Sequence, residues 1–238
     1  MQSDKYEPIA MIRETAQRDK FEEMGVRWVV GDVAEGAPFA EHMSDVDAVI
    51  FAAGAGRHRG PLKQVLVDYA GAVRAIVAAQ ESLVTRFILL SGINSDVMGT
   101  KRSGHSTDYD GPLSAWHKLK AYSEIYLQES HLYGRQLSWT ILCPGRLADD
   151  PQKAGTGRVK ASLIHGEEDL KASLTQEERE AAIQHLPGSH DGRVERLCIS
   201  RDNVAATLVA LLDAPDTVGK SITLIDGVVP VQEALASI

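Results

Sequence analysis

Short apolar runs alternate with longer amphipathic segments along most of the chain. Most of the short runs are apolar at both alternating positions, which is typical of strands that are buried on both faces of a sheet. The longer segments carry apolar residues at helical spacing and therefore indicate amphipathic helices. This order of elements predicts an α/β fold, in which a parallel sheet is covered by helices on both faces.

The expected strands and helices are placed by residue number. The strands are predicted at residues 6–12, 27–31, 48–52, 86–90, 138–142, 193–199 and 221–225. The helices are predicted at residues 15–24, 62–82, 113–132 and 201–212. Gly25 is a typical helix stop, and Ser200 is a good N-cap for the last helix.

Two polar stretches interrupt this alternation. Residues 92–110 contain glycines and follow the end of a predicted strand, where open α/β sheets bind their ligands. Residues 151–191 carry a charged helical piece, TQEEREAAIQHL, between loop-like flanks. We interpret the second stretch as an insertion or lid of a single domain that spans residues 1–238, and its charges as a solvated face.

The composition narrows the class of protein. The chain has 33 acidic and 25 basic residues, and the basic residues form no run, so we expect no nucleic acid partner. No apolar stretch approaches the roughly 20 residues of a membrane span, and the polar N-terminus does not resemble a secretory signal. Cys143 and Cys198 lie in apolar runs, as packed thiols of a reducing compartment do. These features predict a cytoplasmic protein that does not bind membranes, and they leave a homo-oligomer open.

A series of motifs in a fixed order carries a family resemblance. The motifs are IAMIRE, WVVGDV, DAVIFAAGAG, RFILLSG, a lysine in the helix that follows, WTILCPGRL and ISRDNVAATLVALL. In this order the chain resembles the atypical short-chain dehydrogenases/reductases, near their NmrA-like and small NAD(P)-binding oxidoreductase members. The resemblance implies a Rossmann-like, doubly wound parallel sheet with a nicotinamide dinucleotide at its carboxyl edge.

The resemblance assigns residues to the adenosine end of this cofactor. Arg13 follows the first predicted strand, where a guanidinium can fork onto a 2′-phosphate, and this favours NADP over NAD. An exposed arginine at a helix start is an equally weighted alternative. Asp32 and Val33 would border the adenine, with the carboxylate accepting from the exocyclic amine and the valine packing on the ring. An ordinary aspartate turn explains this pair as well.

Small residues mark two further strand ends. Ala52, Ala53 and Gly54 end the third predicted strand, and side chains of this size allow a flat ligand to approach the backbone. We favour ligand contact over simple turn chemistry at this position. Pro144 and Gly145 match the family's Pro-Gly turn beside the nicotinamide, although these residue types also form ordinary turns.

The catalytic positions of the family are matched in part. Ser91 and Lys120 stand at the positions of the family's serine and lysine, whereas Trp116 stands where its tyrosine is expected. An indole N–H donates a hydrogen bond but does not titrate near neutral pH, so the usual general acid is absent. Lys120 is still expected to hold ribose hydroxyls, and Ser91 to hydrogen-bond a substrate or the nicotinamide. A strand cap is the alternative for Ser91.

Other side chains are weaker candidates for the missing proton donor. Tyr122 lies two residues past Lys120, on roughly the opposite face of the helix, and does not substitute for the tyrosine. Tyr109 or His117 would serve only if the polar loop folds inward. The eight histidines show no metal-ligand spacing, so we expect no metal.

The motif series begins at what the family implies to be its second strand. The family's first strand, with a GxxGxxG-type loop that cradles the pyrophosphate, has no counterpart in the sequence. It would lie between the first and third predicted strands, and its loss would open two hydrogen-bonding edges. We expect missing upstream sequence; direct closure of the sheet and a strand from another subunit are the alternatives. Gly54-Ala55-Gly56, followed by Arg57 and Arg59, is not a dinucleotide fingerprint.

Three functions are compatible with these observations. The leading hypothesis is an NADPH-dependent oxidoreductase that acts on a small carbonyl, quinone or flavin-like acceptor. The loss of the titrating tyrosine favours instead a non-catalytic, NADP(H)-sensing regulator or interaction protein. The absent glycine loop favours a truncated scaffold without nucleotide binding.

Overall fold

The computed structural model describes residues 5–35, 39–56, 60–93, 112–148, 156–163, 167–187 and 193–238. Its main sheet contains β3 (Ala48–Phe51), β4 (Arg86–Leu90), β5 (Ser138–Pro144), β7 (Arg158–Ser162), β10 (Lys220–Asp226) and β11 (Val229–Pro230). The strand order is β11-β7-β10-β5-β4-β3. β3, β4, β5 and β10 run parallel, whereas β7 is antiparallel to β10 and β11.

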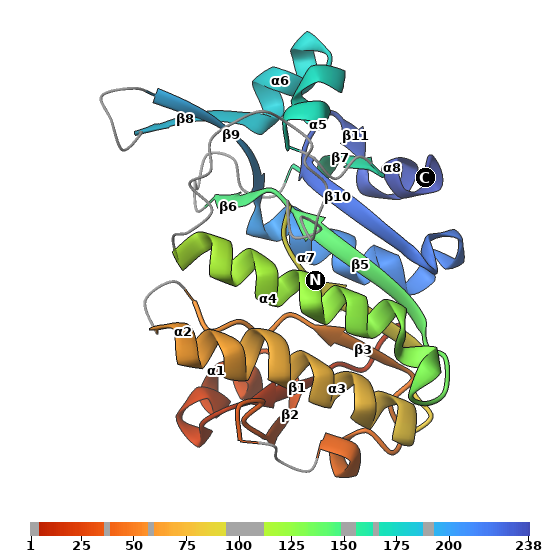
Figure 1. Ribbon diagram of the computed structural model, residues 1–238. Helices are drawn as coiled ribbons and strands as arrows, with labels where there is room; N and C mark the ends of the chain where they lie inside the picture. The colour runs from red at the N-terminus through yellow and green to blue at the C-terminus, as the bar shows by residue number, and fades with distance from the viewer. Residues whose placement is uncertain are drawn as a thin grey trace.

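Helices cover both faces of this sheet (Figure 1). One face carries α2 (Gly60–Gln64), the π-helical turn η3 (Val65–Tyr69), α3 (Ala70–Glu81) and α4 (Pro112–Gln128). The other face carries α7 (Arg201–Ala210) and α8 (Val231–Ala236). Within the described residues, no helix is both long and apolar enough to cross a lipid bilayer.

The side chains of β4 show why the sheet is covered on both sides. Phe87 and Leu89 belong to a buried cluster that includes Ile76 of α3. Ile88 points to the opposite face and belongs to a second cluster, with Val204 of α7. A strand with apolar side chains on both faces therefore needs a helical layer on each side. This arrangement confirms the predicted Rossmann-like α/β class with a mostly parallel sheet.

The predicted elements are present, with shifted ends. β4 occupies the residues predicted for it, and the helix predicted at residues 62–82 is divided into α2, η3 and α3. The helix predicted at residues 15–24 consists of a 3-10 turn (Thr15–Gln17) followed by α1 (Arg18–Glu23). Gly25 follows α1 with a φ of 65°, a conformation that favours glycine. Ser200 caps α7 by accepting a hydrogen bond from the Asn203 N–H, as predicted.

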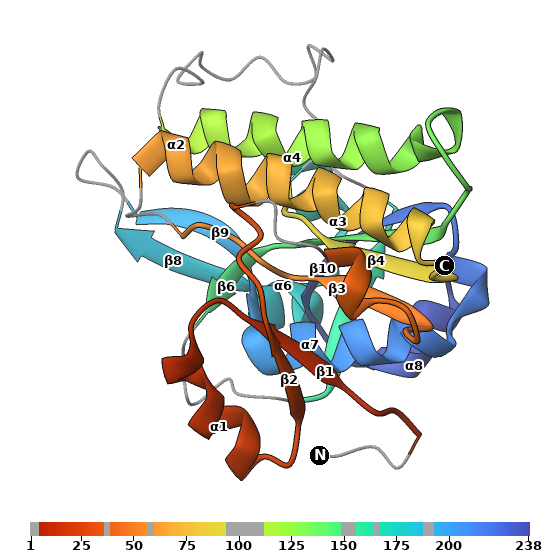
Figure 2. The ribbon, with the colours of Figure 1, turned by 90° about the horizontal axis from the view of Figure 1, so that it is seen from below.

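The first two strands form a sheet of their own. β1 (Ile9–Ile12) and β2 (Arg27–Val30) are parallel, and within the described part of the chain they are not hydrogen-bonded to the six-stranded sheet. Figure 2 shows this pair beside β3. Met11 and Val33 pack against the cluster around α3, so side chains connect the pair to the main body. The two sheets separate between β1 and β3, where the resemblance places the family's first strand. The expectation of upstream sequence stays a prediction.

The stretch interpreted as an insertion or lid is partly built into the main sheet. It contains β7, which pairs with β10, and then α5 (Glu167–Ser173), α6 (Gln176–Ala182) and β8 (Ile183–Pro187). β8 pairs with β9 (Arg193–Ser200), which also pairs with β6 (Arg146–Ala148). The apolar positions of β7 are too few to reveal a strand, which is why the sequence pattern missed it.

One acid of α6 differs from the solvated face expected there. Glu178 is buried, is paired with Lys160 at 3.0 Å, and forms a capping box with Thr175. Burial works to raise the pKa of Glu178, but hydrogen bonds from Thr175 and the ion pair with Lys160 outweigh it and hold that pKa below its ordinary value. This acid therefore fastens α6 to β7.

Candidate functional site

Two of the predicted site residues lie together at the carboxyl end of β4. Ser91 directly follows the strand, and its N–H donates to the Leu142 carbonyl of the neighbouring β5. The Lys120 ammonium of α4 donates to the Leu90 carbonyl at 3.3 Å. The parallel strands and α4 thus place the hydroxyl and the ammonium at the edge where open α/β sheets bind ligands.

Ser91 has a partner that sequence reasoning did not find. Its hydroxyl donates to the carboxylate of Glu124, and both residues are buried, at 6% and 5% exposure. Glu124 lies four residues after Lys120, so both side chains project from the same face of α4. The sequence signal that could have identified Glu124 is its spacing of four residues from the lysine expected at the site.

Lys120 is paired with a second unpredicted carboxylate, Asp68. The Lys120 Nζ lies 3.3 Å from Asp68 Oδ1, and the two side chains are 5% and 1% exposed. Trp116 Nε1 donates to the same oxygen at 3.3 Å. The other oxygen, Oδ2, accepts from the Ala55 N–H at 3.1 Å. Asp68 therefore joins α4 to the segment that follows β3.

A π-helical turn brings Asp68 to this position. The N–H of Ala70 donates to the carbonyl of Val65, five residues earlier, so η3 is one residue wider than an α-helical turn. The Ser123 hydroxyl of α4 donates to the Asp68 carbonyl at 2.9 Å. Such turns occur frequently at functional sites. Asp68 stands inside an apolar helical pattern, and its sequence position alone gives no sign of the wider turn.

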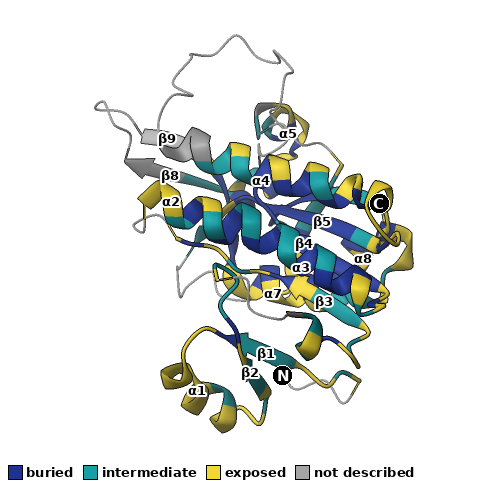
Figure 3. Ribbon diagram, turned by 60° about the horizontal axis from the view of Figure 1, so that its bottom comes forward, coloured by how far each residue is buried: buried dark blue, intermediate teal, exposed yellow. Residues whose placement is uncertain are grey.

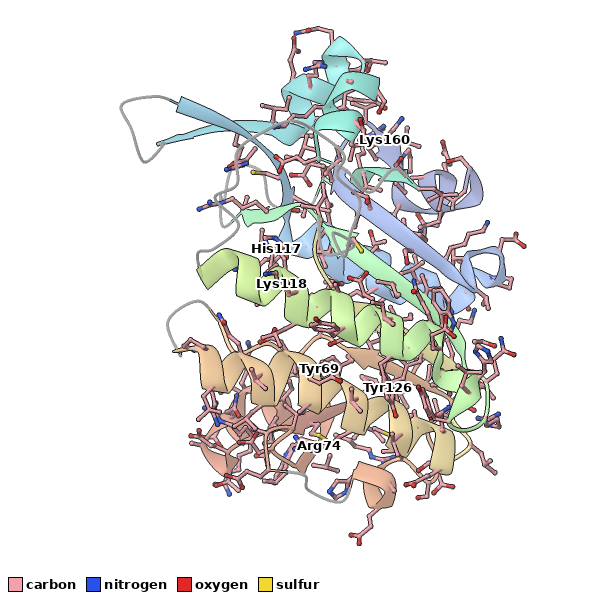
Figure 4. The ribbon with its side chains drawn as sticks, viewed as in Figure 1. Tyr69, Arg74, His117, Lys118, Tyr126 and Lys160 are labelled. Atoms are coloured by element: carbon pink, nitrogen blue, oxygen red, sulfur yellow. The ribbon has the colours of Figure 1, made fainter. Side chains whose placement is uncertain are left out.

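Trp116 covers the backbone beyond β4. A Cβ placed on Gly92 would lie 2.7 Å from Cη2 of the indole, so the glycine allows the ring to lie against the chain. The ring of His117 contacts the indole edge-on, with centroids 4.9 Å apart. Figure 4 labels His117 in the first half of α4. Tyr122 is exposed and contacts Tyr69, away from Lys120, in agreement with its predicted position.

The residues predicted for the adenosine end lie at the carboxyl ends of β1 and β2. Arg13 is exposed, and its Nε donates to Glu14 Oε1 at 2.9 Å. Asp32 Oδ1 accepts from the Ala34 N–H at 2.8 Å, which is the aspartate turn weighed above. Val33 lies close to Gly71 of α3, where an added Cβ would be 3.0 Å from its Cγ2.

Arg74 fixes this segment and was not predicted. Its guanidinium, on α3, donates to the Val33 carbonyl at 2.8 Å and to the Ala34 carbonyl at 3.4 Å (Figure 4). An arginine at this point of a helix carries no sequence signal, because its acceptors are backbone oxygens about 40 residues away. Arg74 therefore holds the turn after β2 against the main body.

The two groups of small residues have different surroundings. Ala52 and Gly54, after β3, are exposed, and a Cβ on Gly54 would meet only Asp68 Oδ1, at 3.3 Å. Ala53 is half-buried between them. Pro144 and Gly145 are buried, and a Cβ on Gly145 would lie 2.6 Å from the Leu197 carbonyl oxygen of β9. Packing against β9 therefore accounts for Gly145, whereas the backbone at Gly54 is open to a ligand.

Part of the predicted site lies outside the described residues. This holds for Arg57 and Arg59, for Tyr109, and for residues 94–110 of the polar stretch. Among the residues that the structure describes, no group of three or more histidines, cysteines or acids is arranged to hold a metal ion.

The described residues fit a nicotinamide dinucleotide at two places. The exposed Arg13 guanidinium offers donors for a phosphate, and the exposed backbone at Gly54 leaves room for a flat group. At the end of β4, Lys120 contacts Asp68 and Leu90 with two of its three ammonium donors in the described structure. A third donor suits a ribose hydroxyl. The Ser91 hydroxyl has one proton, which it donates to Glu124, and it would reach an oxygen of a bound substrate by turning from that carboxylate.

Comparisons with known proteins point to the same ligand class. A family described as NAD(P)H-binding matches residues 1–169. The uncharacterized sugar epimerase YhfK of Bacillus subtilis (strain 168) is 31% identical over 228 residues, which cover 95% of this chain and 85% of that protein.

Two solved structures share the fold over almost the whole chain. A putative NAD-dependent epimerase/dehydratase from Bacillus halodurans superposes with a TM-score of 0.71 at 25% identity, covering 98% of this chain and 88% of that one. The oxidoreductase ylbE from Lactococcus lactis gives a TM-score of 0.69 at 24% identity, with coverages of 99% and 86%.

Proposed function

This chain belongs to the NAD(P)H-binding family, and from that membership we propose that it is an NADPH-dependent oxidoreductase acting on a small carbonyl, quinone or flavin-like acceptor. The observation that carries the proposal is the convergence of Ser91, Lys120 and Trp116 at the carboxyl end of β4. The resemblance to small NAD(P)-binding oxidoreductases is confirmed by the family match and by the fold.

The proposed preference for NADPH rests on Arg13. Its side chain is 39% exposed at the carboxyl end of β1, where the resemblance places the 2′-phosphate of NADP. Glu14 is its present partner, and a phosphate carries more charge than this carboxylate and offers more acceptor oxygens. The guanidinium would therefore exchange an exposed ion pair, which contributes little, for a charge-assisted fork.

Trp116 favours quinone- and flavin-like acceptors over simple carbonyls. A bound NADPH supplies a hydride to the acceptor. Reduction of a simple carbonyl leaves a basic alkoxide, which needs a positioned acid, and the indole of Trp116 does not titrate. A reduced quinone or flavin delocalises the negative charge and can take its proton from water. Ser91 would orient the acceptor oxygen by turning its hydroxyl from Glu124 to that oxygen, and Lys120 would hold the ribose hydroxyls.

The names of the relatives suggest a second candidate reaction, because two of them are described as an epimerase or an epimerase/dehydratase. Sugar epimerisation also uses a nicotinamide, but it returns the cofactor to its starting state. It needs a base that removes a hydroxyl proton, and Trp116 does not provide one. Net consumption of NADPH therefore separates the two reactions.

The test begins with binding and then measures turnover. Fluorescence titration of the purified chain with NADPH is expected to give saturable binding, and its absence would refute the proposal. NADPH oxidation is then followed at 340 nm with quinones, flavins and aldehydes. Quinones or flavins are expected to be reduced faster than aldehydes. Saturable binding without turnover of any acceptor would favour the NADP(H)-sensing regulator.

A further inference from the structure

Asp68 is a buried carboxylate with three described partners. Its two carboxylate oxygens receive Lys120, Trp116 and the Ala55 N–H, and its side chain is 1% exposed. These contacts come from α4 and from Ala55, which directly follows the exposed Gly54, and a Cβ on Gly54 would lie 3.3 Å from Asp68 Oδ1. The carboxylate thus lies directly behind the surface assigned to the cofactor.

The charge of Asp68 matters because of its closeness to Lys120. A buried ammonium without a counterion is strongly unfavourable, and a carboxylate at 3.3 Å compensates it. The ring of Trp116 also lies below the ammonium, with 5.8 Å between Nζ and the ring centroid. A neutral ring adds a weaker attraction and no formal charge. The pair of Lys120 and Asp68 is therefore close to neutral as a unit.

We propose that Asp68 sets the balance between oxidised and reduced cofactor by cancelling the charge of Lys120 at the nicotinamide end of the site. This inference rests on the proposed function. The nicotinamide ring carries a positive charge when oxidised and none when reduced. An uncompensated ammonium nearby would repel the oxidised ring alone, and an uncompensated carboxylate would attract it alone. When the pair is neutral, its charge favours neither the oxidised nor the reduced cofactor, and their relative affinities depend on other contacts.

The test compares the ratio of the dissociation constants of NADP⁺ and NADPH in three variants. Asp68→Asn leaves Lys120 unpaired, so the ratio is expected to rise. Lys120→Met leaves Asp68 unpaired, so the ratio is expected to fall. The double variant removes both charges and is expected to return near the wild-type ratio. Each single change is expected to be roughly three- to thirtyfold, the range for one unit charge in partly buried surroundings.

The opposite signs separate this role from a purely structural one. A variant that merely loosens the site would weaken both cofactor forms and leave their ratio unchanged. Glu81→Gln, at the exposed end of α3, changes the net charge as Asp68→Asn does and should not alter the ratio. If a single variant does not fold, the double variant and the remaining single variant still give a ratio of predicted sign.

A second measurement checks the segment after β3. In Lys120→Met the Ala55 N–H still has Asp68 as its acceptor, so its hydrogen exchange should stay as slow as in the wild type. A fall in the ratio together with protected Ala55 supports a charge effect.

The outcomes distinguish this inference from the function it rests on. If the wild-type chain binds neither form, the proposed function fails and the inference fails with it. If the wild type binds both forms and the single variants shift the ratio in the same direction or not at all, the assignment of Asp68 alone is overturned.

Discussion

The two ends of the proposed cofactor site are built in different ways. At the end of β4, Ser91, Glu124, Lys120 and Asp68 are each at most 6% exposed, and they are held in two buried pairs. At the end of β1, Arg13 is exposed, and the side-chain bonds described for it reach only its neighbour Glu14. Figure 3 shows the same contrast between the buried strands of the main sheet and the half-buried β1 and β2 beside an exposed α1.

The buried pairs are expected to contribute both to the stability of the fold and to ligand binding, whereas the exposed Arg13 is expected to contribute to ligand binding alone. Removing one member of a buried pair leaves the other without compensation, so stability and binding change together. Removing an exposed side chain leaves its surroundings hydrated, so binding can change alone. Substitutions in the two regions should therefore differ in unfolding free energy as well as in cofactor affinity.

The largest effect is expected for Lys120→Met. The unpaired Asp68 should lower the free energy of unfolding by roughly 3–5 kcal/mol, the usual cost of breaking a buried ion pair. Urea denaturation followed by circular dichroism measures the change. Lys118, two residues earlier on α4, is exposed and labelled in Figure 4, and Lys118→Met should cost no more than about 0.5 kcal/mol. Equal losses in the two variants would mean that the pair with Asp68 does not stabilise the fold.

The fold was largely predictable because its strands are apolar on both faces. β4 was predicted with its observed ends, since Arg86 and Ser91 bound an uninterrupted apolar run. β7 was missed for the opposite reason. Its sequence, RVKAS, alternates weakly, and only its pairing with β10 makes it a strand. A local pattern does not report a pairing between distant segments.

The site was predictable where it follows a strand end and hidden where it depends on long-range contacts. Ser91 and Lys120 were found from motif order, and the structure brings both to the end of β4. Asp68 reaches Lys120 only because of a π-helical turn, and Arg74 reaches the turn at Val33 across the molecule. Neither contact has a short-range signature in the sequence.

Arg74→Met should give an intermediate effect, because this arginine joins the turn after β2 to α3 of the main body. Its loss leaves the Val33 carbonyl without its donor and should cost about 1 kcal/mol of unfolding free energy. The turn at Asp32 and Val33 would be less well fixed, so NADH and NADPH should both bind several-fold more weakly. Arg135→Met is the matched control, since Arg135 also donates to a backbone carbonyl, that of Val84, which precedes β4. It should lose similar stability without losing affinity; a similar affinity loss would show that Arg74 acts through general loosening.

Arg13→Ala should have the smallest effect on stability and the most selective effect on binding. Arg13 is exposed and paired only with Glu14 among the described side chains, so the unfolding free energy should change by no more than about 0.5 kcal/mol. If the guanidinium binds the 2′-phosphate, the variant loses a charge-assisted contact of roughly 1.5–3 kcal/mol with NADPH and nothing with NADH. The ratio of their dissociation constants should then change by about 10- to 150-fold. Fluorescence titration with each cofactor measures that ratio. Arg18→Ala is a close control, because Arg18 is also exposed and paired with the acid that follows it, Asp19. Equal weakening of NADPH and NADH binding in Arg13→Ala, or the same preference in Arg18→Ala, would refute the assignment of Arg13 to the 2′-phosphate. The positive charges near β1 would then attract both cofactors without distinguishing NADP from NAD.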